Sequence, residues 1–170
     1  MTTMEPSSTS LALRFQTAHS SDEPEILAFF KERLAELDLP YVPGKSDQDI
    51  TDIDQLYATR GLFLVVRFQG QLVGTGGLRQ GTCPEEADLT KLYLDPSLRN
   101  DGLGALMLDV LVAQAKEYGY QRISLLTNTR LQAAIHLFRK KGFIPDLNQA
   151  DMPASCDLRM VLDLTSSEEH

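Results

Sequence analysis

The stretch from Leu92 to Gly104 constrains the fold of this chain more than any other. An apolar run ends at Asp95–Pro96, a glycine-bearing turn follows, and a long apolar segment begins at Leu103. Proline lacks a backbone N–H and helps to end a strand, whereas Gly102 and Gly104 would let a ligand approach the backbone closely. Unpaired N–H groups at a helix N-terminus favour an anion. The pattern therefore predicts a strand–turn–helix unit that cradles phosphate groups.

The spacing of these glycines argues against two common nucleotide-binding motifs. A Rossmann fingerprint needs a third glycine and a place after the first strand of the fold, whereas this turn lies in mid-chain. A Walker loop needs Gly-Lys followed by Ser or Thr, which this stretch lacks. The remaining pattern is Arg99-x-x-Gly102-x-Gly104. Taken alone, it would also describe a plain turn at the start of a helix.

Two motifs resemble one known family. The loop from Arg99 to Gly104 resembles the acyl-CoA pyrophosphate loop of the GNAT superfamily of N-acetyltransferases. The segment from Ala134 to Phe143, Ala-x-x-Leu-Phe-x-x-x-Gly-Phe, resembles that family's Ala-x-x-Leu-Tyr-x-x-x-Gly-Phe signature. The two together, in family order, are far more specific than either alone. The resemblance covers about Leu11 to Leu164 and implies acetyl-CoA as the co-substrate.

Size and charge limit the class of protein. A chain of 170 residues is most simply one domain, expected over 11–164, between a disordered tail (1–10) and a frayed end (165–170). No apolar run reaches the ~20 residues of a membrane span, and no signal pattern begins the chain, so a cytoplasmic location is expected. A net charge of −8 argues against a nucleic-acid partner. Cys83 and Cys156 form no metal-type pair, and no metal site is expected.

Hydrophobic periodicity predicts an α/β (α+β) chain with the order β-α-α-β-β-β-α-β-α-β-β. Early hairpins and late helical crossovers imply a mixed, mostly antiparallel central sheet with helices on both faces, which is also the fold of the GNAT family. Strands are expected near 11–16, 61–68, 71–78, 88–94 and 122–127, from 143 onward, and over 157–164. A Ser20–Glu23 capping box predicts the start of a first helix that runs to 37, and further helices are expected over 49–57, 103–118 and 131–141.

Two details of these elements bear on the site. Gly74, Gly76 and Gly77 weaken the strand over 71–78 and suggest a bulge or a close approach by another group. The helix over 103–118 is apolar nearly all round and is expected to be largely buried. The alternating last strand suits either a homodimer edge or the closure of the sheet.

The resemblance implies which residues bind acetyl-CoA. Backbone N–H groups of the loop would hold the pyrophosphate, and a bulged strand would pair with the pantetheine arm and polarise the acetyl carbonyl. The implied set comprises the loop residues Arg99, Asn100, Asp101, Gly102, Leu103, Gly104 and Ala105, the strand residues Leu92, Tyr93 and Leu94, and Phe138 and Lys141 of the second motif.

Asp88 is the candidate general base. An alkylamine has a pKa of about 10 and is mostly protonated at neutral pH, so a proton acceptor helps it to attack. Asp88 lies four residues before Leu92, so we expect both side chains on one face of the strand. It also matches a position where related family members often carry an acid. Glu85, Glu86 and Asp54 are the alternatives.

The second motif departs from the family at two positions. Phe138 replaces the usual tyrosine and cannot donate a proton to the leaving thiolate, for which Tyr93 and Thr127 are weaker substitutes. Leu131 stands where the family often has asparagine, and His136 is expected to face away from the site. Two functions therefore remain: an N-acetyltransferase that acts on a small-molecule or amino-acid-like amine, or an acyl-CoA-binding sensor with little or no turnover.

Overall fold

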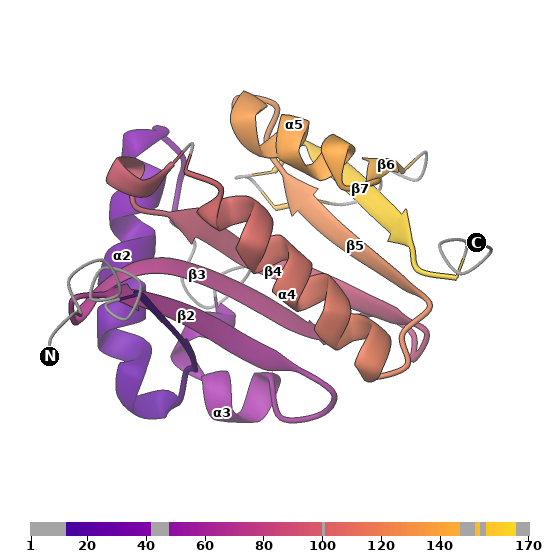
Figure 1. Ribbon diagram of the computed structural model, residues 1–170, viewed down its shortest axis with the longest axis horizontal. Helices are drawn as coiled ribbons and strands as arrows, with labels where there is room; N and C mark the ends of the chain where they lie inside the picture. Colours follow the sequence, from indigo (N-terminus) through magenta and orange to yellow (C-terminus); the bar gives the residue numbers. More distant parts are fainter. Residues whose placement is uncertain (1–12, 42–47, 100, 147–151, 154–155, 166–170) are drawn as a thin grey trace, which may run out of the picture.

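The computed structural model describes residues 13–41, 48–99, 101–146, 152–153 and 156–165. Seven strands of this part of the chain form one sheet in the order β1-β2-β3-β4-β5-β7-β6 (Figure 1). The pair β4–β5 is parallel and all other neighbours are antiparallel. The strands are β1 (Leu13–Thr17), β2 (Leu62–Phe68), β3 (Gln71–Gln80), β4 (Glu86–Leu94), β5 (Arg122–Thr127), β6 (Ile144–Pro145) and β7 (Leu158–Asp163). The predicted fold class and element order are confirmed.

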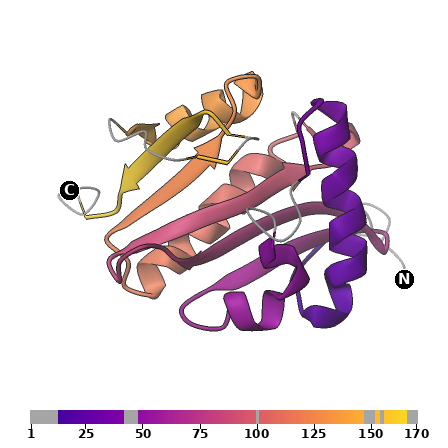
Figure 2. The ribbon, with the colours of Figure 1, turned by 180° about the vertical axis from the view of Figure 1, so that it is seen from behind.

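The helices cover both faces of the sheet (Figures 1 and 2). They are α2 (Glu23–Glu36), α3 (Ile53–Leu56), α4 (Leu103–Glu117) and α5 (Gln132–Lys140), with short 3-10 turns η1 (Ser20–Asp22), η2 (Gln48–Thr51) and η3 (Pro96–Leu98). α4 and α5 pack on one face, where Met107, Leu111 and Phe138 join the larger core. α2 and α3 pack on the other, where Phe30 and Tyr57 join the second core. The sheet thus separates an α4 face from an α2 face.

The α2 face is covered unevenly. The second core draws its sheet residues from β2 and β3, with Tyr93 of β4 packed against it. In Figure 2, α2 and α3 lie over this half of the sheet, and no helix of the described residues lies over β5 and β7. Side chains that point to this face from β5, and from the part of β4 that pairs with β5, therefore stand beside the helices rather than beneath them.

Three local predictions need correction. Asp22, not Glu23, makes the capping contact, accepting a hydrogen bond from the His19 N–H at 2.9 Å, because a 3-10 turn precedes α2. The helix expected over 49–57 divides into η2 and the four-residue α3. α4 is not buried all round: Leu106 and Val110 are 48% and 36% exposed, since α4 rests on the sheet by one face.

Some predictions fall outside the described residues. These are the tail 1–10, the proposed strand start at Leu11, and the last residues 166–170.

None of the helices in the described part of the chain is long and apolar enough to cross a membrane.

Candidate functional site

β4 contains a bulge where it meets β3. Thr75 pairs with Tyr93 and Gly77 with Thr90, so Lys91 and Leu92 together oppose Gly76. Lys91 has φ 51°, a left-handed conformation that is uncommon for a residue with a Cβ. The bulge predicted near Leu92 is therefore present.

The bulge coincides with the end of the β4–β5 ladder. Parallel pairing starts at Glu86 and stops at Leu89, which pairs with Leu125, although β4 continues to Leu94. Beyond Leu89, β5 pairs with β7 and no longer with β4. The second half of β4 thus diverges from its neighbour.

The expectation that Asp88 and Leu92 share one face is wrong. Leu92 points to the α4 face, where its Cδ1 lies 3.2 Å from the place of a Cβ on Gly76, next to Leu111 of α4. Asp88 points to the opposite face, toward Ser124 of β5. The extra residue in the bulge reverses the alternation of side chains, so even-numbered residues before it share a face with odd-numbered residues after it.

The glycines of β3 fit this bulge. A Cβ on Gly74 would lie 3.1 Å from the side chains of Leu94 and Met107, and one on Gly76 would lie 2.9 Å from Leu111. Between them, Thr75 is 2% exposed and its Oγ1 donates a hydrogen bond to the Lys91 carbonyl at 2.7 Å. The hydroxyl satisfies a carbonyl that the bulge removes from the regular ladder.

The predicted loop joins β4 to α4. Gly102 caps α4 with φ 83°, where a side chain would be strained, and Gly104 begins the helix. A Cβ on Gly104 would lie 3.3 Å from Leu94 and 3.4 Å from Leu137 of α5. The start of α4 therefore lies against the end of β4 and against the second motif, so the two motifs meet in space. Asn100 lies outside the described residues.

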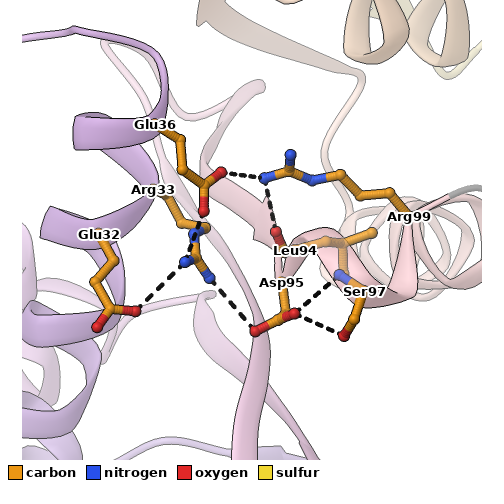
Figure 3. A network of polar contacts seen from close by, with 7 residues as sticks. All are labelled: Glu32, Arg33, Glu36, Leu94, Asp95, Ser97 and Arg99. Carbon is orange, nitrogen blue, oxygen red and sulfur yellow. Dashed lines mark hydrogen bonds and ion pairs between the residues drawn. The ribbon is translucent and has the colours of Figure 1, made fainter.

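The exposed side chain of Arg99 points back to α2 and the end of β4 (Figure 3). Its Nη2 donates to Glu36 Oε1 and to the Leu94 carbonyl, both at 2.9 Å. Glu36 Oε2 in turn lies 2.7 Å from Nη2 of Arg33. The loop is thus tied to the last turns of α2 by charged groups.

Arg33 is the buried centre of this network. It is 6% exposed, stacks 4.7 Å over the Phe29 ring, and lies 3.8 Å from Asp95 Oδ2. Among the described residues, its Nε and Nη1 have no hydrogen-bond partner. Hydrogen bonds from Ser97 lower the pKa of Asp95, and the charges of Arg33 and Arg99 lower it further. The ionised carboxylate holds the turn that follows β4.

Asp88 lies in a largely buried, polar setting. Ser124 Oγ donates to Asp88 Oδ1 at 3.2 Å, and a Cβ on Gly81 would lie only 2.8 Å from that oxygen. Burial raises the pKa of Asp88, the nearby Glu86 adds to the rise, and Ser124 and Arg79 oppose it. A carboxylate with a raised pKa is suited to accept a proton near neutral pH.

The alternative bases are placed less favourably. Glu86 is 7% exposed and forms ion pairs with Arg122 at 2.9 Å and with Arg159 at 3.7 Å. Asp54 lies beside His19 and borders a cavity of about 150 Å³ between β1, α3 and β2, which none of the loop residues lines. Glu85 is exposed in the turn before β4.

Aromatic side chains line the α2 face beside the bulge. The Tyr57 hydroxyl and Thr90 Oγ1 lie 2.6 Å apart, so α3 is fixed to β4 one residue before the bulge. Tyr93 packs against Phe30 of α2 with ring centroids 5.4 Å apart, and Lys91 Nζ lies 5.2 Å over the same Phe30 ring.

The second motif packs mainly in the core. Phe138 is 4% exposed and its ring centroid lies 5.7 Å from that of Phe143. Lys141 pairs with Asp109 of α4 at 2.9 Å, so a contact with the pyrophosphate would require a different side-chain position. Leu131 caps α5 without a side-chain bond, and His136 is exposed. Roles for Phe138 and Lys141 in cofactor binding stay predictions.

Sequence reasoning missed three residues. Arg33 lies at an apolar position of the α2 periodicity, and an arginine there signals a buried ion network. Thr75 lies between glycines in the strand opposite the bulge. Tyr57 is the last residue of the helix that the sequence predicts over 49–57, and nothing in the sequence links its hydroxyl to Thr90.

The mixed sheet, with its bulged β4 and the glycine turn before α4, has the architecture of an acetyltransferase. The chain belongs to the acetyltransferase (GNAT) family, which matches residues 28–143. It is 30% identical over 150 residues to the uncharacterized N-acetyltransferase YjgM of Escherichia coli, covering 84% of this chain and 90% of that protein. It is 27% identical over 101 residues to the IAA acetyltransferase of Azospirillum brasilense, covering 59% and 65%.

Solved structures share the fold. A GNAT-family acetyltransferase of Staphylococcus aureus Mu50 matches with a TM-score of 0.78 at 22% identity, covering 90% of this chain and 99% of that one. A putative acetyltransferase of Salmonella typhimurium, solved with its cofactor acetyl-CoA, matches with a TM-score of 0.69 at 19% identity, covering 94% and 96%.

Proposed function

We propose that this protein transfers the acetyl group of acetyl-CoA to the primary amine of a small molecule by direct attack. The observation that carries the proposal is the divergence of β4 from β5 at a bulge, next to the glycine turn that begins α4. Membership of the GNAT family, whose members use acetyl-CoA, supports it.

The loop and the second half of β4 fit two parts of acetyl-CoA, the pyrophosphate and the pantetheine arm. Backbone N–H groups at the start of α4 would hold the pyrophosphate, because Gly102 and Gly104 keep side chains out of the loop. The backbone of residues 90–94, which β5 does not pair, would hold the pantetheine arm as a strand holds its neighbour. Acetyl-CoA supplies the activated thioester.

The bulge would polarise the thioester carbonyl. A backbone N–H aimed at the developing oxyanion is worth roughly 10²–10³ in rate. Thr75 fixes the bulge through the Lys91 carbonyl and so positions this donor without touching the substrate. The predicted contacts of Leu92, Tyr93 and Leu94 belong to this step.

Asp88 would act as the general base. It accepts one ammonium proton through water, the amine nitrogen forms a bond to the acetyl carbon, and the C–S electron pair leaves with sulfur. The nitrogen gives up its second proton to solvent water, so the products are the amide and the CoA thiolate. A thiol has a pKa of only about 8.5, so the thiolate leaves without an acid. This agrees with a phenylalanine at 138, buried against Phe143, where the family usually has tyrosine.

Calorimetry with acetyl-CoA and with free CoA tests the proposal first, followed by thiol release with a broad panel of amines. Micromolar, saturable binding together with turnover on a primary amine is the expected result. Saturable binding without turnover on any amine would favour the second candidate, an acyl-CoA sensor, which Phe138 and Leu131 make plausible. Absence of binding to both ligands would overturn both functions.

A further inference from the structure

Arg79 lies on the α2 face of the sheet, between Asp88 and Tyr57. It pairs across β3 and β4 with Asp88, so the two side chains are neighbours on one face. Its side chain is half-buried, and its guanidinium carbon lies 5.7 Å from the centre of the Tyr57 ring. Within the part of the chain that the structure describes, Arg79 makes no hydrogen bond and no ion pair.

The arginines of β5 and β7 on this face already have carboxylate partners. Arg122 lies 2.9 Å from Glu86, and Arg159 lies 3.1 Å from Asp146 and 3.7 Å from Glu86. Arg79 differs from both because no described carboxylate is within ion-pair distance of it. Among the described arginines of β3, β5 and β7, Arg79 therefore has the guanidinium that is ready to bind an added anion.

The platform beneath Arg79 is fixed. Tyr57 is 4% exposed and its hydroxyl is 2.6 Å from Thr90 Oγ1. A Cβ on Gly77 would collide with Thr90 and lie 2.8 Å from the Tyr57 ring, so glycine is what lets the ring lie against β4. An arginine over an aromatic face keeps its N–H edge available for a planar anion.

We propose that the acetyl acceptor carries a carboxylate a few bonds from its amine, and that Arg79 binds this carboxylate. The inference rests on the proposed function and adds the substrate class. Asp88 and Arg79 are neighbours of opposite charge, so they complement the ammonium and the carboxylate of an amino-acid-like zwitterion. The guanidinium fork matches a carboxylate with two parallel hydrogen bonds, which an ammonium group cannot reproduce.

The proposal predicts a pH effect of the acceptor. The charge of Arg79 opposes the rise in the pKa of Asp88 that burial causes, and Glu86, Ser124 and Arg159 also act on that carboxylate. A carboxylate bound to Arg79 offsets its charge, so the pKa of Asp88 rises further. The acid limb of kcat should then lie at a higher pH with an acidic acceptor than with its neutral amide.

The test compares free L-amino acids with their carboxamides at saturating acetyl-CoA. A hydrogen bond between charged groups contributes roughly 1.5–3 kcal/mol, so KM should be roughly 10- to 100-fold lower for the carboxylates. Arg79→Gln should remove this preference, and Arg79→Lys should restore part of it because it keeps the charge. Arg14→Gln, which removes an exposed arginine of β1, should leave the preference unchanged.

The outcomes separate this inference from the proposed function. Turnover of amides as good as that of carboxylates would overturn the role of Arg79 and leave the acetyltransferase intact. If neither class is acetylated but another primary amine is, the role of Arg79 is overturned and the acetyltransferase stands. If no primary amine is acetylated, the proposed function fails, and calorimetry of the same amino acids against the CoA-saturated protein decides the subsite. Binding to wild type but not to Arg79→Gln would support it, and no binding to wild type would overturn it.

Discussion

The two halves of β4 differ although they belong to one strand. From Glu86 to Leu89 the strand is paired with β3 on one side and with β5 on the other. From Thr90 to Leu94 it keeps β3 through a bulge and has lost β5. The first half directs Glu86 and Asp88 to the α2 face, and the second half ends at the glycine loop.

This difference shows how one strand can support two kinds of chemistry. Where both neighbours are present, backbone groups are taken up by hydrogen bonds within the sheet, and only side chains can act on a substrate, as we propose for Asp88. Where one neighbour is lost, the backbone itself becomes a binding edge. The bulge at Lys91 divides the two and reverses the side-chain alternation, so acceptor chemistry and cofactor binding should respond to different mutations.

Asp88→Asn should lower turnover more than any other substitution considered, and its effect should be limited to the chemistry of the first half of β4. Loss of a general base typically costs about 10²–10⁴-fold in turnover. Burial raises the pKa of Asp88, and a base acts when deprotonated, so wild-type activity should fall as pH drops through that raised pKa. Steady-state rates across pH should show this acid limb in wild type and not in Asp88→Asn.

Acetyl-CoA affinity in Asp88→Asn should stay near the wild-type value. Glu117→Gln, which removes an exposed carboxylate at the end of α4, is the control and should alter neither turnover nor the pH profile. A pH–rate profile in Asp88→Asn that retains the wild-type acid limb would exclude Asp88 from proton transfer.

Gly104→Val should weaken acetyl-CoA binding at the loop that follows the second half of β4, and this effect should be smaller than that of Asp88→Asn. A Cβ at this position would lie 3.3 Å from Leu94 and 3.4 Å from Leu137, and valine adds two further methyl groups in that space. Overpacking costs about 1–3 kcal/mol, so the Kd for acetyl-CoA should rise roughly 10- to 100-fold by calorimetry. Gly104→Ala should give a smaller rise and guards against misfolding of the valine variant. Wild-type affinity in both would refute the cradle.

The fold was predictable because its signals are local. The Gln69–Gly70 turn, with φ values of 53° and 85°, ends β2 where the apolar alternation pauses. The alternating Leu158–Leu164 run becomes β7, with Met160 and Leu164 buried. Predictions went wrong where tertiary contacts decide: the exposure of Leu106 depends on which face of α4 meets the sheet.

The site was predictable where a motif is contiguous and not where it is assembled. The loop from Arg99 to Gly104 is contiguous, and its place before α4 is as expected. The face of Leu92 relative to Asp88 was wrong because one inserted residue reverses the alternation, and no residue type signals which position is inserted. Tyr57 and Thr90 meet across thirty-three positions of sequence, which only the fold reveals.

Thr75→Val should have the smallest effect, and it should alter both turnover and acetyl-CoA binding, because Thr75 fixes the bulge between the two halves of β4. Valine keeps the volume and removes the hydroxyl that donates to the Lys91 carbonyl at 2.7 Å. A buried carbonyl without its partner costs about 1–2 kcal/mol, which corresponds to roughly a 5- to 30-fold loss in kcat/KM. Steady-state kinetics and acetyl-CoA calorimetry on the same preparation would measure the loss in kcat/KM and the change in acetyl-CoA affinity.

Thr75→Ser is the matched variant, because it keeps the hydroxyl and removes only a methyl group. If the hydroxyl positions the bulge, serine should recover most of the activity that valine loses, even when both variants unfold at the same denaturant concentration. If activity instead follows stability, with serine as impaired as valine, Thr75 merely fills the sheet. The two halves of β4 would then be separated by the left-handed turn at Lys91 without help from β3.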